Sequence, residues 1–78
     1  MRITVKLYAT LRQFRPNAPR SGLALDLPAG STIEALLPRL GLPDGVALVA
    51  MVNDKVEGLE HVLADGDVLN LFPPVAGG

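Results

Sequence analysis

One stretch of this sequence carries apolar residues at the spacing of an α-helix, whereas the other apolar runs have the spacing or length of strands. Ile33, Leu36, Leu37 and Leu40 stand at i, i+3, i+4 and i+7, which gathers them on one face of a helix. A single amphipathic helix among strands buries that face against a sheet. The sequence therefore predicts an α+β fold in which one helix packs across one face of a sheet.

The expected helix has a start signal and two stop signals. Ser31-Thr32-Ile33-Glu34 has the form of a capping box, in which the side chains of Ser31 and Glu34 satisfy backbone N–H groups at the helix start. Pro38 lies inside the stretch and removes one backbone hydrogen bond, so we expect a short or kinked helix. Gly41 ends it.

Residues 2–8 have the alternation of a half-buried strand. Ile3, Val5 and Leu7 fall on one face, and Tyr8 falls on the other with the polar residues of the run. The remaining strands are marked by similar alternation or by continuous apolar runs between turn residues. We expect them at residues 23–27, 46–52, around Val56 and Glu57, and at 68–72, with one helical turn at residues 59–63.

The order of these elements is strand, strand, helix, strand, short strand and last strand. This order indicates a β-grasp fold, a mixed sheet in which the first two strands form a hairpin and the first and last strands lie parallel at the centre. Leu11 and Phe14 are expected to turn back over the core before a loop at residues 15–22. We assign residues 1–72 to one β-grasp domain and residues 73–78 to an extended tail.

Length, charge and residue types argue against several functions. The chain of 78 residues has room for one domain, and its hydrophobic residues, 49% of the total, supply the core. Seven basic and eight acidic residues form no basic stripe, which argues against nucleic-acid binding. The chain has no cysteine, and its first residues lack the apolar run of a signal peptide or membrane span. We expect a soluble, cytoplasmic protein that does not bind membranes.

The chain ends in a segment that cannot continue the last strand, Pro73-Pro74-Val75-Ala76-Gly77-Gly78. The two prolines have no backbone N–H to donate to a sheet, and they favour a stiff, extended exit. Side chains then shrink toward the two glycines, which let a backbone enter a narrow channel. The tail is therefore predicted to carry the carboxylate of Gly78 into a partner protein. The alternative is a frayed end without function, or glycines added for expression.

A free carboxylate is a poor electrophile. Group transfer at Gly78 requires activation by ATP to an acyl-adenylate, which a sulfur nucleophile can attack. The sequence offers no residues for that step, so the ATP would be used by an activating partner, and we expect the chain itself to bind no cofactor.

Residues 65–78, Asp65-Gly66-Asp67-Val68-Leu69-Asn70-Leu71-Phe72-Pro73-Pro74-Val75-Ala76-Gly77-Gly78, closely resemble the end of the small sulfur-carrier subunits of molybdopterin synthase, the ubiquitin-like MoaD/ThiS family. The resemblance runs the full length of the chain. It includes Tyr8-Ala9-Thr10-Leu11-Arg12, Leu27-Pro28-Ala29-Gly30-Ser31-Thr32-Ile33 and Val52-Asn53-Asp54. Carriers of thiamine synthesis share the fold and the Gly-Gly end but usually lack the Phe-Pro-Pro exit.

The resemblance implies a cycle for the tail in molybdenum cofactor biosynthesis. An adenylating enzyme of the ubiquitin-activating type would adenylate Gly78, and a persulfide donor would convert it to a thiocarboxylate. The tail, from Pro73 to Gly77, would insert into the large subunit of molybdopterin synthase, where the sulfur passes to the pterin precursor. The large subunit supplies the catalytic side chains in that family, so this chain would be a carrier subunit and not an enzyme on its own.

Tyr8 and Phe72 are predicted to form an apolar spot beside the tail. Alternation places both on the sheet face opposite the helix, and the β-grasp order makes their strands neighbours. Single apolar residues on a surface are ordinary. Two aromatic residues beside a tail that must dock favour a partner-binding surface. By resemblance, Val56 joins them.

The remaining polar residues do not form a site. His61 has no nucleophile or carboxylate cluster around it in the sequence and is expected at the surface. Asp44, Asp54, Asp65 and Asp67 stand in or beside turns, where Asp is favoured for local hydrogen bonds, so we expect no metal site.

Other functions remain open at this stage. The same tail chemistry serves sulfur carriers for thiamine thiazole or for transfer-RNA thiolation. A ubiquitin-like modifier would instead join Gly78 to a lysine of a target protein, and a plain β-grasp interaction module would have an inert tail.

Overall fold

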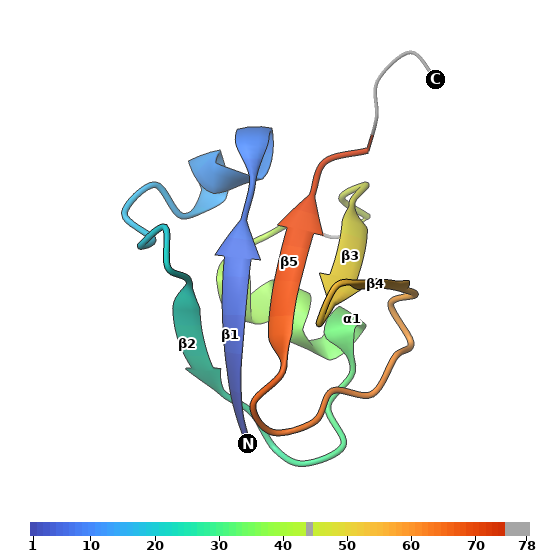
Figure 1. Ribbon diagram of the computed structural model, residues 1–78. Coiled ribbons are helices and arrows are strands. Elements are labelled where there is room, and N and C mark those ends of the chain that lie inside the picture. The colour runs from blue at the N-terminus through green and yellow to red at the C-terminus, as the bar shows by residue number, and fades with distance from the viewer. Residues whose placement is uncertain (44, 75–78) are drawn as a thin grey trace.

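The computed structural model of the protein describes residues 1–43 and 45–74, which form a five-stranded mixed sheet with a short helix across one face (Figure 1). The strands follow the order β2-β1-β5-β3-β4 across the sheet. β1 and β5 run parallel at the centre, and every other neighbouring pair is antiparallel. The predicted β-grasp fold is confirmed. The strands are β1 (Arg2–Leu7), β2 (Leu23–Asp26), β3 (Val49–Val52), β4 (Lys55–Glu57) and β5 (Val68–Phe72).

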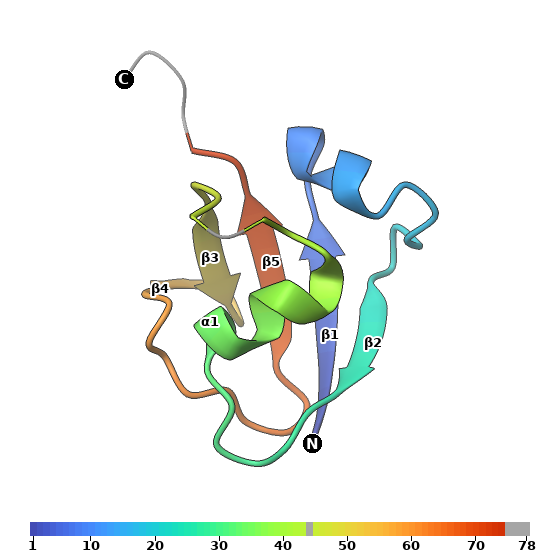
Figure 2. The same cartoon turned by 180° about the vertical axis from the view of Figure 1, so that it is seen from behind.

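The core lies between the sheet and the helix, which Figure 2 shows in front of the strands. Alternate residues of the three central strands point toward the helix and are buried, as the alternation of β1 predicted. The four residues of the helical stripe are buried as well. The buried set includes Ile3, Val5, Leu7, Ile33, Leu36, Leu37, Leu40, Ala50, Val52, Leu69 and Leu71.

The helix is short, as Pro38 predicted. One turn of α-helix, α1 (Ile33–Leu36), passes directly into a 3₁₀ helix, η2 (Leu37–Leu40), which has Pro38 at its start. Gly41 then ends the element with a φ of 80°, in the left-handed region that glycine adopts without steric cost.

The helix cap differs from the prediction by one residue. Thr32 is the N-cap, because its Oγ1 accepts a hydrogen bond from the backbone N–H of Ala35. The hydroxyl of Ser31 instead donates to the carbonyl of Pro28 in the preceding turn. The prediction of Ser31 as the cap of a capping box was therefore wrong.

Residues 59–63 do not form the predicted helical turn. They run beside the start of α1, where the carbonyl of Leu59 accepts from Glu34 N at 3.0 Å and that of His61 accepts from Ile33 N at 3.1 Å. In the same segment, Leu63 N donates to the carbonyl of Ser31 at 2.9 Å. The first two bonds satisfy N–H groups that a helix start leaves without intrahelical partners, and all three tie the segment to the start of α1.

The third strand is shorter than predicted. It begins at Val49 and not at Val46, because Val49 pairs with Phe72, the last residue of β5. The next residue of that neighbour is Pro73, which has no N–H to donate. Val46 and Leu48 still pack against the core although they lie outside the sheet.

The turn between β3 and β4 is tied to the start of β5. Asn53 and Asp54 occupy it with φ of 49° and 73°, a left-handed conformation that Asn and Asp tolerate. The side chain of Asn53 donates to Asp67 Oδ1 at 2.8 Å and accepts from the N–H of Val68 at 3.0 Å. The other oxygen of Asp67 accepts from Ala64 N, so this Asp has the turn-bonding role that was predicted.

Candidate functional site

The tail leaves the body from the centre of the sheet. β5 ends at Phe72, and the chain continues through half-buried Pro73 to exposed Pro74 without entering another element. Because β1 and β5 are parallel, the 3₁₀ helix η1 (Ala9–Phe14) follows β1 at this same end of the sheet (Figure 1). The predicted site residues Val75, Ala76, Gly77 and Gly78 lie outside the described residues.

Tyr8 and Phe72 lie together at the root of the tail, as predicted. Their rings stack with centroids 4.4 Å apart and an interplanar angle of 13°. The backbone N–H of Tyr8 donates to the carbonyl of Leu71 at 3.1 Å, and its hydroxyl donates to Asn70 Oδ1 at 3.0 Å. Tyr8 is 37% exposed, so the pair presents an aromatic surface on the side of the sheet away from α1.

Val56 shares this side of the sheet with the aromatic pair. It stands opposite Met51 in the register of β4 and β3, and Met51 in turn stands opposite Asn70. Residues directly opposite in neighbouring strands point to the same side. Val56 is 68% exposed, so it adds apolar surface to this side of the sheet. We call Tyr8, Val49, Met51, Val56 and Phe72 the outer apolar face.

A depression of about 450 Å³ opens in the outer apolar face beside the tail root. Val49, opposite Phe72 in the register, forms part of its wall. The lining residues are all apolar: Ala9, Val49, Met51, Phe72 and Pro73. The sequence analysis missed Ala9, Val49 and Met51. Val49 and Met51 could have been found only from the pairing of Val49 with Phe72. The continuous apolar run 46–52 has no alternation that would indicate which of its residues face outward.

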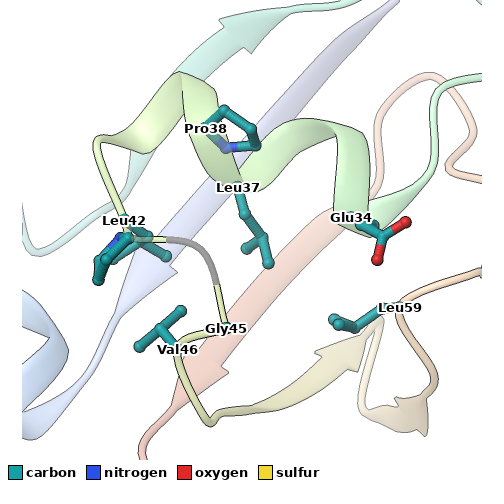
Figure 3. Close-up of a pocket in the computed structure, with 8 residues that line it drawn as sticks. Glu34, Leu37, Pro38, Leu42, Gly45, Val46 and Leu59 are labelled. Atoms are coloured by element: carbon teal, nitrogen blue, oxygen red, sulfur yellow. The ribbon is translucent and has the colours of Figure 1, made fainter.

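A second pocket, of about 380 Å³, lies between the helix and the segment that follows it (Figure 3). Leu37, Leu42 and Val46 line it, and Glu34 lies at one end beside Leu59. It contains none of the predicted site residues.

Charged groups in the described part of the chain do not assemble into a catalytic centre. His61 Nδ1 lies 3.6 Å from Glu57 Oε1, with both side chains partly exposed near the surface, where His61 was predicted. At the far end of β1, a hydrogen bond from Arg2 and its positive charge lower the pKa of Asp26, and the same contact raises the pKa of Arg2. Within residues 1–43 and 45–74, no group of three or more His, Asp or Glu side chains could hold a metal ion. Nor does that part of the chain contain a helix of the length and apolarity needed to cross a membrane.

Comparisons with known proteins agree along the whole chain. A model of the ThiS family matches residues 5–78. The molybdopterin synthase sulfur carrier subunit of Escherichia coli (strain K12) is 35% identical over an alignment 85 residues long, which covers 97% of this chain and 99% of that protein.

Solved structures give the same fold. The crystal structure of SAMP1 from Haloferax volcanii matches with a TM-score of 0.78 and 25% identity, covering 100% of both chains. A chain from the complex of subunits 1 and 2 of the molybdopterin-converting factor of Helicobacter pylori matches with a TM-score of 0.63 and 23% identity, again over 100% of both chains. The family match, the full-length relative and the ubiquitin-like sheet together show that this chain belongs to the ThiS family.

Proposed function

We propose that this chain is the sulfur-carrier subunit of a molybdopterin synthase. The observation that carries the proposal is that the central strand β5 ends within the outer apolar face and continues directly into Pro73 and Pro74. A partner docked on that face would receive the tail. The Escherichia coli relative, which matches over nearly its whole length, is a sulfur carrier of this kind.

In the proposed cycle the carboxylate of Gly78 is first activated. An adenylating enzyme of the ubiquitin-activating type joins it to AMP and releases pyrophosphate from ATP. The outer sulfur of a persulfide donor then attacks the acyl carbon, and AMP leaves. A thiol cleaves the resulting sulfur–sulfur bond, becomes part of a disulfide, and leaves the thiocarboxylate on Gly78. We place these steps in the cytoplasm, where ATP is available.

The thiocarboxylate then serves the large subunit. The tail residues Pro73 to Gly77 occupy its channel, while Tyr8, Val56 and Phe72 hold the folded body against it. The thiocarboxylate sulfur displaces an oxygen substituent of the pterin precursor, and water then hydrolyses the acyl–sulfur bond, so the carboxylate is restored and the sulfur stays on the pterin. This chain is a carrier and not a catalyst, so the side chains that act on the precursor belong to the large subunit.

Reconstitution tests the proposal. The thiocarboxylated chain, mixed with the large subunit of a molybdopterin synthase and the pterin precursor, is expected to yield the sulfurated pterin with return of the carboxylate form. The unmodified carboxylate form is the matched control and should yield none. Binding without sulfur transfer to the pterin would contradict the proposal. Transfer instead to a thiazole precursor or to transfer RNA would assign the chain to one of those pathways.

A protein modifier is the second candidate, and the similarity to SAMP1 favours it. SAMP1 of Haloferax volcanii is a small archaeal modifier protein, and the match to it covers the full length of both chains at 25% identity. In that case Gly78 would form an isopeptide bond with lysines of target proteins. Mass spectrometry of trypsin-digested, denatured cell extracts would then find target lysines joined to residues 56–78 of this chain, because Lys55 is its last lysine or arginine.

A further inference from the structure

Ala9 has a backbone conformation that its side chain disfavours. Its φ is 52°, and the other non-glycine residues with positive φ in the described chain are Asn53 and Asp54. Asn and Asp visit the left-handed region with help from local hydrogen bonds, but alanine has only a methyl group, which crowds the following carbonyl. Glycine would remove that crowding.

The methyl group of Ala9 contributes little to the stability of the folded domain. Ala9 is exposed and lies outside the buried core, at the first position of η1. Its neighbour Tyr8 provides the contacts that hold this corner, by stacking on Phe72 and by the hydrogen bond from Leu11 N to its carbonyl. The stability of the free domain therefore does not account for a side chain at this position.

Ala9 does line the depression in the outer apolar face, together with Val49, Met51, Phe72 and Pro73, and its methyl group is the only side-chain group that it can present there. Pro73 belongs to the exit of the tail, and four residues separate Pro74 from the end of the chain. Four residues reach at most about 14 Å, so a protein that encloses the carboxylate of Gly78 has to approach the tail root. The depression lies where that protein makes contact.

We infer that Ala9 is a docking residue whose methyl group improves binding of the large subunit at the expense of the stability of the free carrier. The inference rests on the proposed function. The occupant of the depression is a large apolar side chain of the large subunit. A polar group would lose its hydration there and find no hydrogen-bond partner among the side chains that line it.

Replacing Ala9 by Gly tests both halves of the inference. Relief of the left-handed strain outweighs the entropy that glycine adds to the unfolded chain, so Ala9→Gly should raise the melting temperature by about 4 °C. Loss of one methyl group from a dry contact should weaken binding to the large subunit about fourfold. Thermal unfolding and titration calorimetry measure the two effects on the same full-length chain.

Two further variants separate backbone strain from side-chain contact. Asp54→Gly relieves a positive φ at the β3–β4 turn, away from the depression, and should bind the large subunit as the parent does. Ala9→Asn introduces a residue that tolerates the left-handed region but places a polar amide in the depression. It should melt no lower than the parent and bind about tenfold more weakly.

Failure of the inference and failure of the proposed function give different results. If Ala9→Gly binds the large subunit as tightly as the parent chain, the inference is wrong and the proposed function still stands. The same holds if the melting temperature of Ala9→Gly is below that of the parent. A parent chain that does not bind the large subunit at all contradicts the proposed function, and the docking role of Ala9 with it.

Discussion

The ring of Tyr8, which directly follows β1, stacks on the ring of Phe72, the last residue of β5, with centroids 4.4 Å apart. Both residues precede a change of direction, because η1 follows the first and the tail follows the second. The stack therefore fixes the point where the tail begins relative to the outer apolar face. A partner that recognises the pair finds the tail at a constant position.

A charge on this pair should prevent docking without unfolding the domain. Tyr8→Asp or Phe72→Asp is expected to weaken binding to the large subunit, or to the adenylating enzyme, at least tenfold, because a carboxylate would be buried in an apolar contact. Val62 is 57% exposed and is bridged to Thr32 beside the start of α1, outside the outer apolar face, so Val62→Asp is the matched control. Binding is measured by calorimetry and folding by circular dichroism. Equal weakening by Val62→Asp would show that charge alone, and not position, matters.

Removal of Gly78 should abolish sulfur transfer and leave the fold intact. Residues beyond the last strand contribute little to a domain core, so the melting temperature should change by less than about 2 °C. The assay follows the sulfurated pterin in the reconstituted system. Transfer at the parental rate by the shortened chain would locate the chemistry elsewhere.

The shape of the tail should matter as well as its carboxylate. Gly77→Val adds a β-branched side chain that restricts the backbone and widens the tip, so the variant should fold normally and be adenylated poorly. Mass spectrometry after incubation with ATP, the adenylating enzyme and a persulfide donor measures the sulfur-for-oxygen exchange, and fragmentation places it. Gly77→Ala is the graded control. Parental rates for Gly77→Val would contradict insertion into a narrow channel.

Asn53 should be a stability residue and not a functional one. Asn53→Ala removes two side-chain hydrogen bonds to the start of β5 and places alanine at a φ of 49°. We expect a loss of about 2 kcal/mol in the free energy of unfolding. Asn53→Gly loses the same bonds without the strain, so it should cost about 1 kcal/mol less than Asn53→Ala in denaturant titrations. An equal loss for the two variants would mean that the left-handed conformation costs alanine nothing here.

Local patterns predicted the elements of this fold better than their boundaries. Alternation in β1 and the helical stripe from Ile33 to Leu40 are properties of neighbouring residues, and both were found as expected. The helix start beside Thr32 and segment 59–63 are tied to each other by backbone hydrogen bonds between these two parts of the chain. No window of sequence around either segment contains that information.

In the candidate site too, features set by neighbouring residues could be predicted, and features set by distant contacts could not. Tyr8 and Phe72 could be placed from alternation and the order of strands. Met51 belongs to the outer apolar face because of its register with Asn70 and Val56, and the apolar run around it has no alternation that would reveal this. The strain at Ala9 has no signature in the sequence, since alanine is compatible with most conformations and only the backbone angle identifies it.

The position of β5 between β1 and β3 has a consequence for how the carrier is made. The last strand to be synthesised fills the middle of the sheet. One edge of β1 pairs with nearby β2, but its other edge pairs with residues more than sixty positions away, as Thr4 does with Val68. Contacts this distant in sequence make folding slow and cooperative. A nascent chain cannot complete its core until nearly all of it has left the ribosome. A polypeptide that stops before Val68 therefore lacks the strand that joins β1 to β3.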